Sequence, residues 1–296
     1  MTEAAAPSGG LWRGDEVHLE PYLDRIGYTG DRAPTAESLR ALQRAHVLSM
    51  PFENLDPVLG RGVSLELPAL QDKMVRGGRG GYCFEHVSLF AAALERLGFG
   101  VTGLIGRVRL GSDKIKPATH AVLRVETAES PRTGRAWLCD VGFGMSPLVP
   151  LELADGAEAS AGDWRYRLEH AEVTPGAEGW VLHVWSAQDG RWFDRHTFTP
   201  GPAYPVDYQV ASHFVSTHPR SPFVTRPFLQ RVYDDRGVVL DGRTLSTFRP
   251  RDGSTEKREL EPPEAVKTLA TVFRVHVTAS DEQRLTALLA EAGDDR

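Results

Sequence analysis

Apolar residues in the first third of the chain recur at the spacing of amphipathic helices. Those between residues 35 and 50 share one face, and Pro51 is expected to end the helix they form. A second helix is expected over residues 68–77. A third begins at Cys83, behind a glycine-rich stretch, because its apolar residues recur at i, i+3, i+4, i+7 and i+10. Gly98 is a natural C-terminal cap for this third helix.

Beyond residue 100 the hydrophobic period shortens from 3.6 toward 2. Turn residues separate the runs, and Asp189-Gly190 between two aromatic runs predicts a hairpin. Strands at this spacing, without helices between them, favour an antiparallel barrel or sandwich over βαβ units. Short runs of β-branched and aromatic residues predict these strands over residues 101–109, 120–126, 137–141, 164–168 and 180–185.

The pattern changes again near Pro200 and Pro205. A short helix is expected over residues 207–213, strands over 229–248, and a capped amphipathic helix over 280–292. We therefore predict an α+β fold in three parts. These are an N-terminal helical bundle over residues 1–99, a central antiparallel β-barrel over 100–204, and a C-terminal mixed α/β lid over 205–296.

Composition places the chain among folded globular proteins. Its 296 residues are 41% hydrophobic and 25% charged, which is near the globular norm. No apolar run approaches the roughly 20 residues of a membrane span, and residues 1–10 lack the basic and apolar regions of a secretory signal. We therefore expect a cytoplasmic protein with no membrane partner. The net charge of −6, from 34 basic and 40 acidic residues, argues against nucleic acid as a partner.

The chain has two cysteines, Cys83 and Cys139, too few for a disulfide framework. Cys83 stands at a predicted helix N-terminus, where free backbone N–H groups and the helix dipole favour a thiolate. Cys83 is therefore the first candidate for a nucleophile. The alternative is an inert cysteine that begins a core helix.

A nucleophilic cysteine needs a base, and the base needs an orienting acid. His120 opens one predicted strand and Asp140 ends another, so both side chains lie at strand ends where they can face a cleft. Each residue also has an ordinary explanation. A histidine is often satisfied at a strand start, and an aspartate before Val-Gly is typical of a turn.

Four residues could instead ligate zinc: Cys83, His86, His120 and Cys139. Adjacent residues of a strand face opposite sides, so Cys139 and Asp140 cannot both point toward Cys83. Structural zinc sites also use tighter paired spacings than these. We therefore expect no metal, and we expect Cys139 to be a small apolar core residue.

Four linked motifs resemble the arylamine N-acetyltransferase family, in family order across nearly the whole chain: Pro51-Phe52-Glu53-Asn54-Leu55, Arg79-Gly80-Gly81-Tyr82-Cys83-Phe84-Glu85, Thr119-His120 and Asp140-Val141-Gly142-Phe143-Gly144. The resemblance implies the three-part plan described above. It also implies that Cys83 accepts the acyl group, with His120 as its base and Asp140 as the orienting acid. Acetyl-coenzyme A is the implied donor.

Other positions take roles only through this resemblance. Glu53 and Arg79 correspond to a structural ion pair, and Phe84 offers its backbone N–H as an oxyanion donor. One departure is Val87, because most members carry Asn four residues after the cysteine, which leaves the hydrogen bonding of that turn and the substrate range open. The remaining positions belong to the substrate cleft: Phe52 and Phe143 as pocket aromatics, Thr119, Phe143 and Gly144 near the entry of the pantetheine arm, and Phe223 as a residue that reaches the cleft.

Acetyl transfer from one thioester to a cysteine exchanges like for like, and an aromatic amine, largely unprotonated at neutral pH, can then attack the acetyl-cysteine. We therefore expect ping-pong transfer from acetyl-coenzyme A to arylamines or hydrazines. An amide synthase that closes a polyketide chain onto an aromatic amine would use the same residues and stays an alternative. Two further alternatives are a thiol hydrolase or transglutaminase-like enzyme and a binding module with a structural Cys83. A homodimer is compatible with the sequence.

Overall fold

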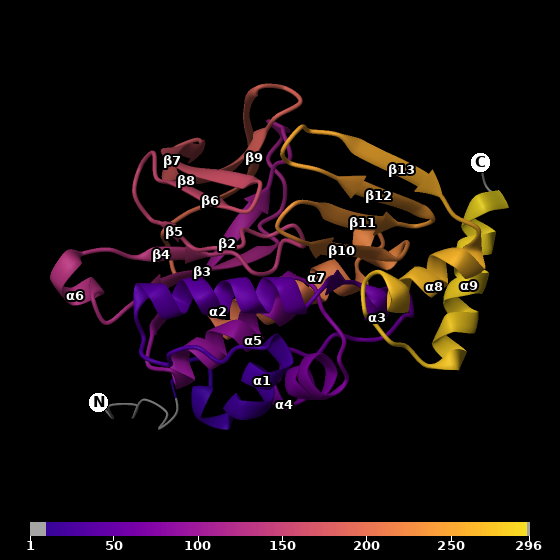
Figure 1. Cartoon of the computed structure of the whole chain (residues 1–296), viewed down its shortest axis with the longest axis horizontal. Helices are drawn as coiled ribbons and strands as arrows, with labels where there is room; N and C mark the ends of the chain where they lie inside the picture. The colour runs from indigo at the N-terminus through magenta and orange to yellow at the C-terminus, as the bar shows by residue number, and fades with distance from the viewer. Residues whose placement is uncertain (1–9, 295–296) are drawn as a thin grey trace.

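The helices of the N-terminal part of the chain gather on one side of the molecule, two antiparallel sheets stand against them, and the last two helices lie together beside the second sheet (Figure 1). The structure, a computed structural model, describes residues 10–294. The prediction about a secretory signal falls almost wholly on residues 1–9 and therefore lies outside the described residues. The predicted α+β class is confirmed.

The helix predicted over residues 35–50 is present as α2 (Ala36–Ser49), and Thr35 caps it by accepting a hydrogen bond from the Ser38 backbone N–H at 3.2 Å. The helix predicted from residue 68 differs, because α4 (Leu67–Leu70) continues as a π-helical segment, η2 (Gln71–Arg76). Three short helices were not predicted, since they have too few turns for a periodic signal: η1 (Gly14–Glu16), α1 (Leu19–Ile26) and α3 (Leu55–Val58).

Helix α5 (Cys83–Arg96) is packed on nearly all sides, and Cys83 is its first residue. Phe84 and Phe90 are among its fully buried side chains. Gly98 ends the helix as predicted, in the left-handed conformation with φ +87°. The N–H groups of Gly98 and Phe99 donate hydrogen bonds to carbonyl oxygens of the last helical turn, which have no partner within the helix.

Eight antiparallel strands form one curved sheet in the order β5-β4-β3-β2-β9-β8-β7-β6. The edge strands β5 and β6 contact each other, so the barrel is nearly closed. The predicted hairpin at Asp189-Gly190 joins β8 to β9, and the strand predicted over 137–141 ends at Cys139, which leaves Asp140 just beyond it. The strands are β2 (Gly100–Val108), β3 (His120–Glu126), β4 (Trp137–Cys139), β5 (Leu151–Glu152), β6 (Glu158–Ala161), β7 (Trp164–Thr174), β8 (Ala177–Ser186) and β9 (Arg191–Phe198).

The second sheet has the order β1-β10-β11-β12-β13 and joins segments far apart in the sequence. Its first strand, β1 (Phe52–Glu53), comes from the N-terminal part and pairs with β10 so that Phe52 lies opposite Gln230. The helical part of the chain therefore contributes a strand to the C-terminal part. The other strands are β10 (Phe228–Val232), β11 (Gly237–Asp241), β12 (Thr244–Phe248) and β13 (Thr255–Glu259).

The predicted boundaries after residues 99 and 204 both fall in connections between elements, and the division into three domains stays a prediction. Helix α7 (Pro205–Thr217) is longer than the predicted 207–213, because a proline in its first turn starts it earlier. Helix α9 (Ala279–Asp294) covers the predicted 280–292. In this part of the chain η3 (Pro222–Val224), β13 and α8 (Pro262–Thr271) were not predicted. In the barrel part α6 (Ser130–Thr133), β5 and β6 were not predicted either.

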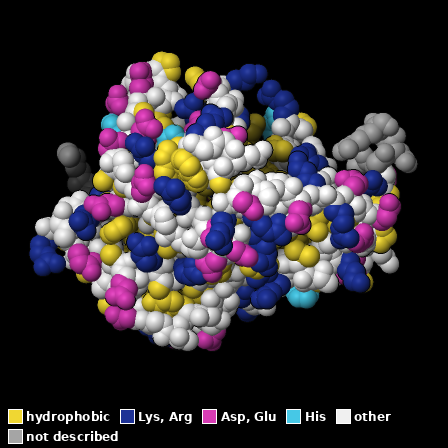
Figure 2. Space-filling model, turned by 45° about the horizontal axis from the view of Figure 1, so that its top comes forward, with side chains coloured by type: hydrophobic (Ala, Val, Ile, Leu, Met, Phe, Trp, Pro, Cys, Tyr) yellow, Lys and Arg dark blue, Asp and Glu magenta, His cyan; other side chains and the backbone are white. Residues whose placement is uncertain are grey.

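Within residues 10–294, no helix combines the length and the apolar character that crossing a bilayer requires. Basic and acidic side chains are interspersed on the face shown in Figure 2. A nucleic-acid backbone favours a surface of uniformly basic side chains, which this face does not present.

Two buried histidines join α1, α2 and α5. The Tyr22 hydroxyl oxygen lies 2.9 Å from His46 Nδ1, and His46 Nε2 lies 3.0 Å from His86 Nδ1. His86 Nε2 in turn lies 3.2 Å from the Pro51 carbonyl oxygen. Burial lowers the pKa of His86 to about 4 and holds the pKa of His46 well below its ordinary value. Both rings are therefore neutral at pH 7.

We predict that the free energy of unfolding falls as the pH is lowered from 6.5 toward 5. A histidine whose pKa is lower in the folded than in the unfolded state takes up a proton on unfolding, so each one lowers the free energy of unfolding by at most about 1.4 kcal/mol per pH unit. Urea unfolding at each pH measures the loss. His86→Gln should flatten the dependence, and His213→Gln, at an exposed position of α7, should leave it unchanged. A wild-type stability that stays constant from pH 7 to 5 would contradict the neutral pair.

Candidate active site

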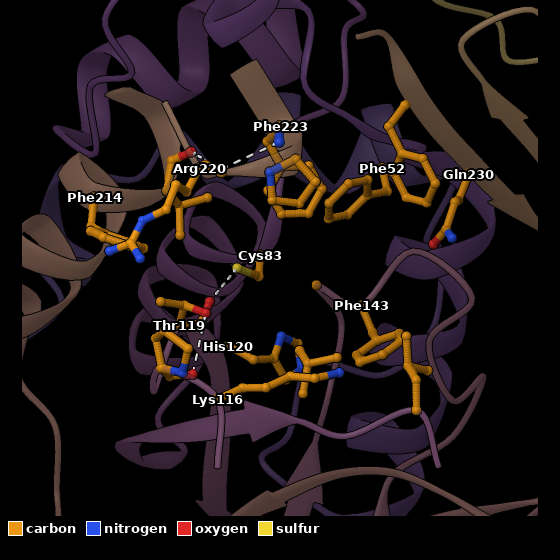
Figure 3. A pocket seen from close by; sticks show the side chains of 18 of the residues that line it. Phe52, Cys83, Lys116, Thr119, His120, Phe143, Phe214, Arg220, Phe223 and Gln230 are labelled. Atoms are coloured by element: carbon orange, nitrogen blue, oxygen red, sulfur yellow. Dashed lines mark hydrogen bonds between the residues drawn. The ribbon is translucent and has the colours of Figure 1, made fainter. Parts of the chain in front are cut away.

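The Cys83 sulfur faces a cavity of about 460 Å³ (Figure 3). The thiol lies 3.5 Å from the Thr119 carbonyl oxygen, to which it can donate a hydrogen bond. In Figure 3 the sulfur lies between one wall that carries Phe52 and Phe223 and another that carries His120 and Phe143. Because Cys83 is the first residue of α5, its sulfur is near the positive end of the helix dipole.

Strands β3 and β4 bring His120 and Asp140 together. His120 is the first residue of β3, Asp140 follows β4, and the strands pair so that Leu123 lies opposite Cys139. His120 Nε2 is 3.2 Å from Asp140 Oδ1, and both side chains are buried. The Cys83 side chain lies close enough to the His120 ring to help raise its pKa, and Nδ1 is the ring nitrogen that the contact with Asp140 leaves available. The three predicted residues are thus neighbours.

The pKa values of this pair follow from the balance between burial and charge. Burial alone would lower the pKa of His120, but the Asp140 carboxylate outweighs it and, with the Cys83 sulfur, raises the pKa of His120 to about 9. Burial alone would raise the pKa of Asp140, yet the imidazoles of His120 and His196 hold it far below its ordinary range. At pH 7 the pair is an imidazolium and a carboxylate, and an imidazolium beside a thiol favours the thiolate.

His196 in β9 is a member of the site that sequence reasoning missed. Its Nε2 lies 2.9 Å from Asp140 Oδ2, and its side chain is fully buried. Burial lowers the pKa of His196 to about 4, so the ring is neutral and donates its Nε2–H to the carboxylate. His196 is one of ten histidines and stands in no motif, so the sequence offers no signal that singles it out.

The nitrogens and oxygens of His120, Asp140 and His196 lie within 4.8 Å of one another, as the ligands of a metal ion would. Both imidazoles already lie at hydrogen-bond distance from the carboxylate. Hydrogen bonding therefore accounts for the cluster.

The zinc ligands considered from the sequence are not assembled. His86 Nδ1 faces His46, and His86 Nε2 faces the Pro51 carbonyl oxygen, so neither nitrogen is directed to the Cys83 thiol. The Cys139 side chain lies in the hydrophobic core, where burial raises its pKa. Cys139 is the small core residue that was predicted.

The loop after Asp140 packs against the backbone of Cys83. A Cβ on Gly142 would lie 2.6 Å from Cys83 Cα and 2.8 Å from its carbonyl oxygen, so this approach requires glycine. Gly144 has φ +100°, and a Cβ there would overlap the Gln230 side chain. Gly144 adjoins this residue of the cavity wall and does not itself line the cavity.

The cavity is lined by Phe52, Thr119, Phe143 and Phe223. The Phe52 and Phe223 rings are in tilted contact, with centroids 5.6 Å apart. The Phe143 ring meets the His120 ring edge to face at 5.0 Å. Aromatic rings therefore flank the thiol on two sides, which suits a flat apolar substrate.

Phe84 and Val87 point into the core. The Phe84 side chain is fully buried against Tyr82 and Tyr208, so it does not line the cavity, and an oxyanion role for its backbone N–H stays a prediction. Val87 is also fully buried. The departure from Asn at this position therefore places an apolar side chain in an apolar environment, and no buried polar group is left to satisfy.

A largely buried ionic cluster fixes the loop that precedes Cys83. Arg79 Nη2 lies 2.7 Å from Glu53 Oε1, and Arg79 Nη1 lies 3.0 Å from Asp56 Oδ1. Lys73, which was not a sequence candidate, lies 2.7 Å from both Asp56 and Glu85. Burial alone would lower the pKa values of Lys73 and Arg79, but the carboxylates raise both. Loss of one partner would leave a buried charge uncompensated.

Comparison with known proteins identifies the family. A family model described as N-acetyltransferase matches residues 35–282. The arylamine N-acetyltransferase of Mycobacterium tuberculosis is 38% identical over 93% of this chain and 96% of its own. The structure of the arylamine N-acetyltransferase from Mycobacterium abscessus has 47% identity and a TM-score of 0.91, over 96% of this chain and 99% of its own. The structure of the Mycobacterium marinum arylamine N-acetyltransferase in complex with CoA has 40% identity and a TM-score of 0.82, over 92% of this chain and 98% of its own. This chain belongs to the arylamine N-acetyltransferase family.

Proposed function

We propose that this chain transfers acetyl groups from acetyl-coenzyme A to arylamines or hydrazines by a ping-pong mechanism. Cys83 carries the acetyl group, and His120 transfers the protons. Asp140 orients the His120 ring and favours its protonated form. The observation that carries the proposal is the buried His120–Asp140 pair beside the Cys83 thiol in an aromatic-lined cavity. Coenzyme A as the donor agrees with the CoA complex of the Mycobacterium marinum relative.

In the first half-reaction, His120 Nδ1 holds the proton of the Cys83 thiol and the sulfur attacks the thioester carbonyl carbon. A new carbon–sulfur bond forms to Cys83, and the bond to the coenzyme sulfur breaks. The coenzyme thiolate then leaves with the proton from His120. One thioester replaces another, so the step needs little driving force.

In the second half-reaction, the amine nitrogen attacks the acetyl carbon on Cys83. The amine proton passes to His120 Nδ1, and the carbon–sulfur bond to Cys83 breaks, which releases the amide. The Cys83 thiolate and the His120 imidazolium are restored as a pair. Asp140 keeps its negative charge in both half-reactions, because the imidazoles of His120 and His196 hold its pKa far below neutral pH.

The cavity carries a positive electrostatic bias. Besides His120, the described residues that line it include one lysine and two arginines, Lys116, Arg220 and Arg226, and no acidic residue. Arg226 is paired with Asp241 outside the lining. A phosphorylated donor is compatible with this charge, and a neutral or anionic acceptor should be favoured over a cationic one.

The amide synthase considered from the sequence gains no support from the comparisons, because the relatives described above are named for acetyl transfer.

Mixing the protein with acetyl-coenzyme A should add the mass of one acetyl group to the chain. Intact-mass spectrometry measures the adduct, and peptide mapping should place it on Cys83. Cys83→Ala should gain no acetyl group, and the matched control Cys139→Ala should gain one. Arylamines should then release the acetyl group as the amide. An acetyl group on Cys139, or wild-type protein that stays unmodified, would overturn the proposal.

Acceptor charge should change the rate in the direction set by the cavity. We expect kcat/KM for para-aminobenzoate to exceed that for an aniline with a para quaternary ammonium group by about fivefold or more, the effect of about 1 kcal/mol between unit charges near 4 Å in water. Para-toluidine is the neutral reference. Arg220→Gln should reduce the ratio. A cationic aniline that reacts as well as the anionic one would show that the basic side chains do not act on the acceptor.

A further inference from the structure

Strand β9 contains a β-bulge next to His196. On the neighbouring strand β8, His183 pairs with Asp194 while the preceding residue, Leu182, pairs with His196, so Arg195 is an extra residue in β9. A bulge breaks the alternation of a strand and redirects the side chains beside it. Arg195 and His196 are consecutive, yet both are buried. Both side chains contact the Phe143 ring, so the bulge lets two consecutive residues reach the same side of β9.

Strand pairing on both sides of β9 fixes the backbone of His196. His196 pairs with Leu182 of β8 and with Val108 of β2, so it occupies a central position in the barrel. Its ring packs on the Phe143 ring, with centroids 5.7 Å apart. The Arg195 guanidinium carbon lies 4.2 Å from the centroid of that same ring. Two consecutive residues of the bulge therefore hold Phe143, and one of them also reaches Asp140.

The hydrogen bond of His196 defines its tautomer. Nε2 lies 2.9 Å from Asp140 Oδ2, and an ionised carboxylate can only accept, so Nε2 carries the hydrogen. Nδ1 is buried and has no hydrogen-bond partner among the described residues. The only polar contact of the ring in that part of the chain is thus with Asp140. A buried imidazole with one unsatisfied nitrogen lowers the stability of the fold. The hydrogen bond to Asp140 is therefore the contact that accounts for a histidine at this position.

We propose that His196 is a positioning residue for acetyl transfer: by holding Asp140 Oδ2 from the bulge in β9, it directs Asp140 Oδ1 at His120. This role depends on the proposed function of Cys83, His120 and Asp140. A carboxylate held at one oxygen can rotate about its Cβ–Cγ bond. Held at both oxygens by two imidazoles, it keeps His120 in one orientation toward the thiol, and catalysis is sensitive to such alignment.

Among the described charged and titratable groups around Asp140, only the two imidazoles donate side-chain hydrogen bonds to it. Tyr166 and Cys139 stay neutral below pH 9, because burial raises the pKa of each, and Arg195 stays cationic. Asp140 Oδ1 accepts from His120 and, at 3.4 Å, from the Gly142 backbone N–H, and Oδ2 accepts from His196; the two imidazoles lower the pKa of the carboxyl. Removal of the His196 donor therefore lets Asp140 take up a proton at higher pH. The groups that face Asp140 directly or through His120 are His120, His196, Tyr166, Arg195, Cys139 and Cys83.

Two variants of His196 separate the hydrogen bond from packing. His196→Gln keeps an N–H donor at the place of Nε2, and His196→Phe keeps a ring but removes the donor. In rapid-quench measurements with acetyl-coenzyme A, His196→Phe should acetylate Cys83 about tenfold or more slowly, with the half-saturating concentration of acetyl-coenzyme A unchanged. In this variant the decline of the acetylation rate at low pH should begin at a higher pH than in the wild type, because Asp140 takes up a proton more readily. His196→Gln should stay close to wild type in rate and profile, as should His183→Gln on β8.

A His196→Phe protein with the wild-type rate and pH profile would overturn the positioning role, and so would a His196→Gln protein as slow as His196→Phe. Nitrogen-15 NMR of the wild-type histidine rings provides a test that needs no variant. His196 should show the Nε2–H tautomer from pH 5 to 8, and the opposite tautomer would also overturn the role. Wild-type acetylation of Cys83 by acetyl-coenzyme A tests the proposed function separately, so failure of one does not look like failure of the other.

Discussion

The buried carboxylate of Asp140 is the charge on which the arrangement of this site depends. An unpaired charge in the interior costs several kcal/mol, so the fold has to supply partners for both carboxylate oxygens. It does so with two imidazoles, from the start of β3 and from the bulge in β9. The same pairing raises the pKa of His120 to about 9 and thereby keeps an imidazolium next to the Cys83 sulfur. The need to pair this buried carboxylate thus links the packing of the barrel to the charge that lies beside Cys83.

Cys83 comes from the helical side of the molecule, and two features hold it against the barrel. The ionic cluster of Glu53, Lys73 and Arg79 fixes the glycine-rich loop that leads into α5. On the other side, Gly142 allows the loop after Asp140 to touch the backbone of Cys83. A side chain on Gly142 would push these two layers apart, and the distance from Cys83 to His120 would grow with it. The geometry of the site is therefore set by backbone contacts as much as by the side chains that react.

Much of this could be predicted from the sequence, for identifiable reasons. The helical period over α2 and α5, the glycine cap at Gly98 and the change to period 2 are local signals, and they gave the right element types. Cys83, His120 and Asp140 emerged because each lies at the end of an element and because together they match the motifs of a family. The pairing of β1 with β10 and the placement of His196 beside Asp140 were out of reach. Strand partners and bulges depend on contacts between distant segments, and the single histidine that a bulge redirects has no sequence pattern of its own.

The central claim is that Asp140 keeps His120 protonated beside Cys83 at neutral pH. A pH titration of the nitrogen-15 signals of the His120 ring in the wild-type protein, assigned with His120→Gln, tests it most directly. The account predicts an imidazolium at pH 7 that titrates with a pKa of about 9, well above the ordinary value for histidine. A His120 ring that is neutral at pH 7 and titrates near or below 6.5 would contradict it.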